Sequence, residues 1–167
     1  VPQDTGTSDY ISKRVVLGMP YLGLGLGAQT FTDTTISYND GAVAKNLMPY
    51  FRSVDAGQLP LQDLYELPLV HMMAKMICVS FYFGEIHRGA FQRKFERTLE
   101  EAYPAEIAFA IEQGLMEWKP DTLSMTSLGE DHFSGLCALF HAPSVKSYLL
   151  DYQGDMSQDR RLALRVS

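Results

Sequence analysis

Cysteine is scarce in this sequence, and its scarcity excludes several kinds of site. The only cysteines among the 167 residues are Cys78 and Cys137, each inside an apolar run. Two thiols this far apart cannot supply the ligand set of an iron–sulfur cluster or of a structural zinc ion. Buried free thiols, suited to a reducing cytoplasm, are the expected state, and the sequence alone leaves a bond between the two open.

The chain also has few basic residues and no long apolar run. The chain has 14 Lys and Arg against 20 Asp and Glu, for a net charge of -6. That balance argues against nucleic acid as a partner, because phosphate binding depends on Lys and Arg. No apolar run is long enough to span a bilayer, and the polar opening residues do not form a signal peptide. We therefore expect a globular protein that uses neither a membrane nor nucleic acid. Because the chain does not open with Met, we also expect a truncated or processed product.

Glycine, by contrast, is gathered in one short stretch. From Tyr21 the residues alternate, with Gly23, Gly25 and Gly27 on one side and leucines and Ala28 on the other. A period of two predicts a strand. Since glycine weakens a strand, a row of it marks close approach of a ligand or of another backbone. Packing relief or a bulge explains the same pattern, and the residues alone leave both readings open.

The remainder of the chain has the pattern of a mainly helical fold. Asp40 can cap a helix over residues 41–56 that ends at Gly57. Apolar residues at steps of three and four predict a helix over residues 63–81, and its extra methionines should make it the most buried one. The other predicted elements are a linker at 58–63, a turn at 83–89, a short hairpin at 115–126, and helices at 87–95, 104–113, 126–140 and from Pro143 onward.

The order of helices and hairpin between residues 87 and 140 resembles a winged-helix arrangement. Winged helices often bind DNA, but they also serve as packing modules. The helix that follows the hairpin reads SLGEDHFSGLCALF and has no Arg or Lys to meet phosphates. A packing module is therefore favoured. The predicted fold class is α+β, mainly helical, with a small β-hairpin.

No catalytic set is visible among the polar residues. Tyr38 and Asn39 precede a predicted helix and could line a substrate mouth, although turn and cap roles are commoner for such residues. The four histidines are not spaced as metal pairs: His71, His87, His132 and His141. Glu85 with His87 is a pair of polar residues close enough in sequence to form a small site. We assign no catalytic residue and no metal ligand.

Four short motifs follow one another in the chain, between residues 20 and 140. They are YLGLGLGAQTF with SYND, then YFRSVDAGQLP, then AFAIEQGLMEW, then LSMTSLGEDHF. They resemble four motifs of one family, the oxygen-independent coproporphyrinogen III oxidase-like radical S-adenosylmethionine (SAM) proteins. In that family the motifs are a Gly-x-Gly-x-x-Ala strand with a Tyr/Trp-Asn pair, a Gly-x-x-Pro segment, a Gly-Leu turn and a Leu-x-Leu-Thr-x-x-Gly helix start. The shared order of the four motifs makes the resemblance specific.

The resemblance implies a division of the chain. Residues 1–35 would be the end of a radical SAM barrel with one leftover strand, loose or rearranged here, and residues 36–153 the helical carboxy-terminal domain of the family, followed by a tail at 154–167. The family's Cys-x-x-x-Cys-x-x-Cys motif and most of the barrel are absent. We therefore expect SAM and a four-iron four-sulfur cluster in the parent protein, and neither cofactor nor radical chemistry in this chain alone.

The resemblance also assigns candidate residues. Gly23, Gly25 and Gly27 would leave room for SAM in the intact parent, with Ala28 and Gln29 near its adenine. The parent would be a cytoplasmic oxidoreductase of porphyrin and heme biosynthesis, in which a 5′-deoxyadenosyl radical abstracts hydrogen from propionate side chains and decarboxylation yields vinyl groups.

Partners and alternatives follow from the same resemblance. The expected partners are the remainder of the barrel, a porphyrin-like substrate and, through the exposed strand, a second copy of the chain. Heme chaperones and radical SAM methyltransferases share the carboxy-terminal domain, so the resemblance does not fix the reaction. A stand-alone interaction domain is the alternative from a different class.

Overall fold

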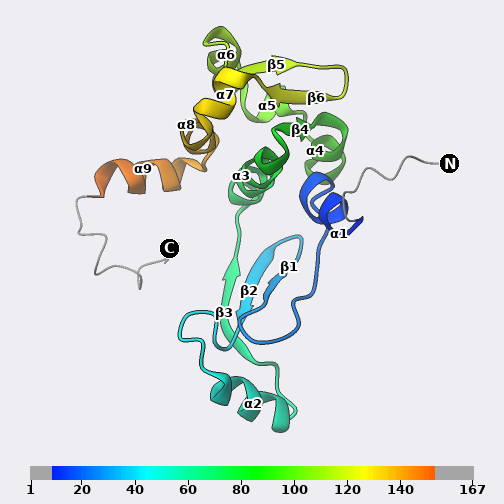
Figure 1. Cartoon of the computed structure of the whole chain (residues 1–167), viewed down its shortest axis with the longest axis vertical. Helices are drawn as coiled ribbons and strands as arrows, with labels where there is room; N and C mark the ends of the chain where they lie inside the picture. Colours follow the sequence, from blue (N-terminus) through cyan, green and yellow to red (C-terminus); the bar gives the residue numbers. More distant parts are fainter. Residues whose placement is uncertain (1–8, 153–167) are drawn as a thin grey trace, which may run out of the picture.

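The computed structural model describes residues 9–152, in which two small antiparallel sheets occupy different parts of the molecule (Figure 1). The first sheet has the order β1-β2-β3, from Gln29–Phe31, Thr35–Asn39 and Leu61–Glu66. The second has the order β4-β6-β5, from Glu85–His87, Thr122–Met125 and Met116–Trp118. Figure 1 shows the first sheet extending away from the helices, with α2 (Leu47–Asp55) at its far end and the second sheet among the helices at the opposite end.

The second sheet belongs to a winged helix. In chain order the elements are α3 (Leu69–Ser80), the 3-10 turn η2 (Phe81–Phe83), β4, α4 (Arg88–Phe95), α5 (Leu99–Ala102), α6 (Pro104–Glu112), β5 and β6. The first strand pairs with the last, which places the β5–β6 hairpin as the wing. Helices α7 (Ser127–Asp131), α8 (Phe133–Leu139) and α9 (Pro143–Asp151) follow the wing. The mainly helical α+β prediction is confirmed.

Local sequence signals set several boundaries of this part. The Thr98 side chain accepts from the Glu101 backbone N–H while the Glu101 side chain accepts from the Thr98 N–H, a capping box that starts α5. Pro104 occupies the first turn of α6, where its missing N–H costs nothing. Gly114, at φ +68°, follows that helix in the left-handed conformation that commonly ends helices. The Thr126 side chain caps α7 by accepting from the Gly129 N–H.

The chain enters this part through a short helical segment, α1 (Asp9–Ile11) followed by the π-helical turn η1 (Ser12–Val16). The turn η1 packs against α3. Residues 9–152 include no helix with both the length and the apolar character that crossing a bilayer requires.

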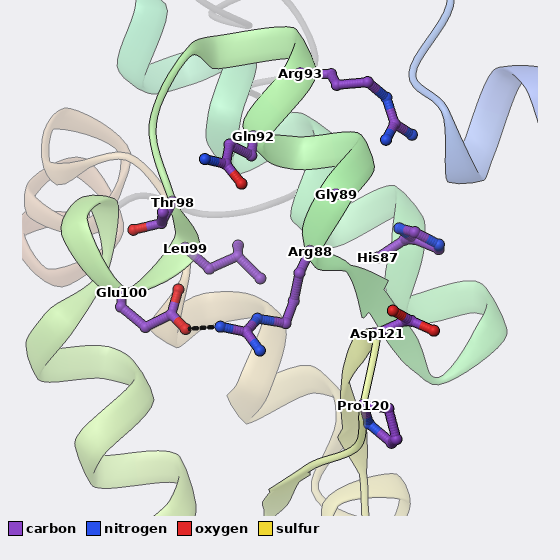
Figure 2. Close-up of a pocket in the computed structure, with 10 residues that line it drawn as sticks. All are labelled: His87, Arg88, Gly89, Gln92, Arg93, Thr98, Leu99, Glu100, Pro120 and Asp121. Carbon is purple, nitrogen blue, oxygen red and sulfur yellow. Dashed lines mark hydrogen bonds and ion pairs between the residues drawn. The ribbon is translucent and has the colours of Figure 1, made fainter.

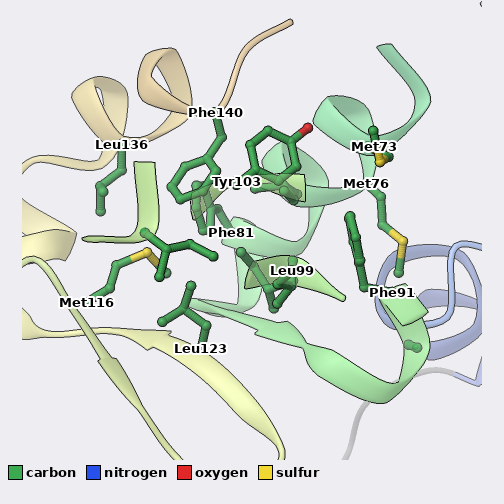
Figure 3. Packing of buried hydrophobic residues seen from close by; sticks show 14 of the residues in the cluster. Met73, Met76, Phe81, Phe91, Leu99, Tyr103, Met116, Leu123, Leu136 and Phe140 are labelled. Atoms are coloured by element: carbon green, nitrogen blue, oxygen red, sulfur yellow. The ribbon is translucent and has the colours of Figure 1, made fainter. Parts of the chain in front are cut away.

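The hydrophobic core lies inside the winged helix (Figure 3). Helix α3 is its centre, since six of its twelve residues are buried, Met72, Met73 and Met76 among them. This confirms the prediction that the methionine-rich helix is the most buried one. The ring of Phe140 is fully buried and meets Phe81 and Tyr103 edge-on, with ring centroids 5.6 and 5.5 Å away.

Several predicted boundaries were wrong, and strand pairing is the main reason. Residues 61–66 pair with β2 as β3, where the end of a linker and the start of the 63–81 helix were expected, so α3 begins only after Pro68. Glu85–His87 pair with β6, where a turn was expected. Such short strands carry no period of their own and are specified by their partners. The tail at 154–167 lies outside the described residues.

Two predicted helices also changed. The first begins at Leu47, because the side chain of Asn46 and not that of Asp40 accepts the first free N–H, from Met48. It ends as expected before Gly57, which has φ +68°. The helix predicted over residues 126–140 is divided at His132 into α7 and α8.

Phe140→Ala should lower the free energy of unfolding by about 3–5 kcal/mol, because it removes a buried ring and leaves a cavity. Urea denaturation followed by circular dichroism measures the change. Phe109→Ala is the matched control, since Phe109 is 49% exposed, and it should change stability by less than about 1 kcal/mol. Equal effects of the two substitutions would contradict the position of the core.

Candidate functional site

The glycine-rich stretch forms a loop, and the strand predicted over residues 21–28 is wrong. Tyr21 pairs with Phe31 through two backbone hydrogen bonds of 2.9 Å, as an isolated bridge at the edge of the first sheet. The chain between Tyr21 and β1 then turns back on itself, helped by Gly25 at φ +104°. Regular pairing resumes only at Gln29.

Asn39 holds this loop in place. Its side chain is 6% exposed, and its Nδ2 donates to the carbonyl oxygens of Gly23 at 3.2 Å and Gly25 at 2.9 Å. The Asn39 backbone N–H donates to the Ala28 carbonyl at 3.0 Å. The amide therefore satisfies carbonyl groups that no strand partner reaches. Asn39 therefore fixes the shape of the loop whose glycines are predicted to border SAM.

Gln29 links two tyrosines on the other side of the sheet. The Tyr21 hydroxyl donates to Gln29 Oε1, and Gln29 Nε2 donates to the Tyr38 hydroxyl at 2.6 Å. Gln29 and Tyr38 are directly opposite in the β1–β2 register, so their side chains share a face. The structure therefore brings together the glycine loop, Gln29, Tyr38 and Asn39, which are separate in sequence. No signal in the sequence predicted the hydrogen bonds that join them.

The three glycines have different surroundings. A Cβ at Gly23 would lie 2.3 Å from the Gln29 carbonyl oxygen, and one at Gly27 would lie 3.0 Å from Ala42 Cα. Close approach of another backbone therefore accounts for both. A Cβ at Gly25 would meet nothing within 4 Å. Among the three glycines, only Gly25 is consistent with open space for a ligand, whereas Gly23 and Gly27 are consistent with close backbone packing.

The histidines have ordinary local partners. His71 Nε2 lies 3.0 Å from Ser144 Oγ, His132 Nδ1 lies 2.9 Å from the Leu128 carbonyl oxygen, and His87 Nδ1 accepts from the Ala90 N–H at 3.3 Å. Glu85, the predicted companion of His87, accepts from Ser124 Oγ at 3.2 Å. Within residues 9–152, no three His, Cys, Asp or Glu side chains converge as a metal site.

The two cysteines are free thiols, as expected, but both are partly exposed where buried thiols were expected. Cys78 Sγ lies 3.7 Å from the Cys137 carbonyl oxygen and 3.6 Å from His141 Nδ1. Burial raises the pKa of Cys78 to about 12. The thiol therefore stays protonated at neutral pH, and this Cys–His pair lacks the thiolate that nucleophilic catalysis requires.

A pocket of about 260 Å³ lies where α4 begins, beside α5 and the wing (Figure 2). Arg88 reaches across it to form an ion pair with Glu100. The Arg88 guanidinium also stacks on Trp118, 4.6 Å from the ring centroid. Arg88 and Glu100 therefore neutralise each other, while His87, Arg93 and Asp121 also line the pocket.

The comparisons with known proteins concern the fold. No protein-family model matches the chain, and no curated protein matches it. Among solved structures, the chain is similar to coproporphyrinogen III oxidase from Escherichia coli, a radical SAM enzyme, with a TM-score of 0.52 at 15% sequence identity. The similarity is one of fold. It covers 71% of this chain and 27% of that one, so the chain spans about a quarter of the solved protein's length.

Asn39→Ala should release the glycine loop, because two carbonyl groups lose their donor. We expect a loss of about 1–3 kcal/mol in stability and faster hydrogen exchange at Gly27 and Ala28, measured by NMR. Asn46→Ala, which removes a cap from exposed helix α2, is the control and should leave exchange in the loop unchanged. Unaltered loop exchange in the Asn39 variant would refute this role.

Proposed function

We propose that this chain is the carboxy-terminal part of a radical SAM enzyme that resembles the oxygen-independent coproporphyrinogen III oxidases. In this proposal the first sheet and its glycine loop complete a catalytic barrel contributed mostly by the rest of the parent protein. The winged helix covers the barrel mouth, excludes water and shapes the pocket for a porphyrin-like substrate. The similarity of fold to coproporphyrinogen III oxidase supports this arrangement.

The observation that carries the proposal is the exposed apolar surface of the first sheet and α2. Helix α2 has no buried residue, although Leu47, Phe51 and Val54 recur at steps of four and three on one face. Other large apolar side chains of the same region are also exposed: Leu22, Leu24, Val43, Met48, Leu59, Leu61 and Leu64. So much clustered apolar surface is typical of an interface. The remainder of the barrel is the partner that we propose for it.

The residues of the glycine loop fit a SAM site in part. Gly25 borders open space, but the Gln29 amide and the Tyr38 hydroxyl lie on the other side of the sheet, and the amide is already hydrogen-bonded to Tyr21 and Tyr38. SAM would supply the radical that abstracts hydrogen. This chain's residues would hold the cofactor and orient it. Cys78 in α3 and Cys137 in α8 are too few to hold a cluster, so in this proposal the cluster ligands come from the rest of the parent.

A second candidate, a stand-alone interaction module, is favoured by one observation. A groove beside η2 is lined by aromatic side chains together with Met125 and Glu130, and among the aromatic ones Tyr82 is 80% exposed and Phe83 43% exposed. Nucleic acid does not suit the module, because α6, the helix before the wing, has Glu106 and Glu112 but no Arg or Lys. A reading frame without the three-cysteine motif upstream of this chain would favour this candidate over the enzyme.

Substitution of Gly25 tests the proposal in the protein encoded by the complete reading frame, loaded with iron and sulfide. Gly25→Phe should weaken SAM binding at least tenfold, measured by equilibrium dialysis, because the ring would fill the open space. Gly57→Phe is the matched control, since Gly57 also has positive φ and open surroundings but lies beyond α2. It should bind SAM as the unmodified protein does.

Equal SAM affinity in both variants would mean that the glycine loop is structural only. Heme titration of the same protein separates the relatives that share this domain. Stable heme binding without decarboxylation of coproporphyrinogen would identify a chaperone, and methyl transfer from SAM would identify a methyltransferase.

A further inference from the structure

Three cationic side chains from three different elements meet beside one pair of aromatic rings. The Arg14 guanidinium, from η1, lies 4.7 Å from the Tyr21 ring centroid. Lys75 Nζ, from α3, lies 3.9 Å from the ring centroid of Phe31, and Lys94 Nζ, from α4, lies 5.7 Å from it. The two rings are 5.9 Å apart. The cations therefore surround the junction between the first sheet and the winged helix.

The charges at this junction are not balanced within the described residues. Lys94 pairs with Asp33 at 3.1 Å. Arg14 donates to the Tyr10 hydroxyl at 3.0 Å and stacks on Tyr21, but residues 9–152 offer it no carboxylate. Lys75 has neither an ion pair nor a hydrogen bond within the same range. Two positive charges thus lack an anionic partner among residues 9–152.

This concentration of positive charge is unfavourable for Lys75. Burial first, then the charges of Arg14 and Lys94, lower the pKa of Lys75 to about 8. Contact with the Phe31 ring offsets part of the penalty, because the ring face attracts a cation. The sequence gives one sign of this arrangement. Lys75 is the only Lys, Arg, Asp or Glu of α3 and stands within the apolar run MMAKMIC. An anion bound here would relieve the repulsion.

We propose that Arg14 and Lys75 bind the oxyanion group of a small ligand at the junction between β1, η1 and α3. A guanidinium presents two parallel N–H donors to a carboxylate or phosphate, and an ammonium adds a mobile point charge. The partly exposed Tyr21 ring offers an apolar surface to the body of such a ligand, while the buried Phe31 ring holds the Lys75 ammonium in place. A carboxylate and a phosphate present the same chemistry to these residues. The inference does not depend on the proposed radical SAM function.

The pKa of Lys75 is the readout, measured by NMR on the full chain with lysine labelled at ¹³Cε. The probes are inorganic phosphate and citrate, each compared with sodium chloride at equal ionic strength. Because a bound anion stabilises the charged ammonium, a ligand should raise the Lys75 pKa in a saturable manner. A rise in the Lys75 pKa with phosphate alone or with citrate alone would support the site and show whether it binds a phosphate or a carboxylate. No rise beyond that in chloride would overturn it.

Variants separate a site from a structural cluster. Arg14→Gln should weaken the saturable effect on Lys75 at least tenfold, and Lys75→Met should abolish the chemical-shift changes that the probe causes at Tyr21. Lys13→Met is the matched control, because Lys13 adjoins Arg14 but is exposed and pairs with Asp9. It should leave the effect unchanged. If all three variants reduced the response to the anion equally, the response would be non-specific screening of charge and the proposal would be overturned.

Discussion

The burial of Phe31 is the contact on which the arrangement of the two parts depends. Phe31 is 5% exposed and is the one residue of the described first sheet that belongs to the buried core cluster, with Tyr21 and Ile36 partly buried beside it. Lys75 and Lys94 approach the same ring from α3 and α4. Phe31, with Tyr21, Ile36 and the cationic neighbours of its ring, therefore joins the sheet to the core of the winged helix.

This attachment leaves most of the sheet's apolar surface uncovered, and the functional proposals follow from that. Asn39 and Gln29 give the glycine loop a defined shape, yet Gly25 borders open space and α2 packs its apolar face against nothing described. A segment with ordered polar contacts and an uncovered apolar face is typical of one part of a larger folded unit. The chain shares its fold with part of coproporphyrinogen III oxidase.

The sequence predicted the winged helix better than the sheet, for physical reasons. Capping residues such as Thr126 and breakers such as Gly114 act locally, so helix boundaries near them could be read directly. The strands β3 and β4 exist through their partners and gave no local signal. The alternation from Tyr21 had the period of a strand, but Gly23 and Gly27 instead permit a loop that contacts its own backbone. Asn39 contacts Gly23, Gly25 and Ala28, and Gln29 contacts Tyr38 on the other side of the sheet, while SAM binding by these residues stays a prediction.

Hydrogen exchange of the full chain tests the central claim most directly, because local opening reports how much packing protects each element. If the first sheet is attached mainly through Phe31, the amides of β1, β2 and β3 should exchange far faster than those of α3 and β6. The slow hydrogen exchange of α3 and β6 should also be retained when Phe31 is replaced by Ala. Equal protection of both sheets would contradict the account, since it would show that the first sheet is stable without the partner that we propose for it.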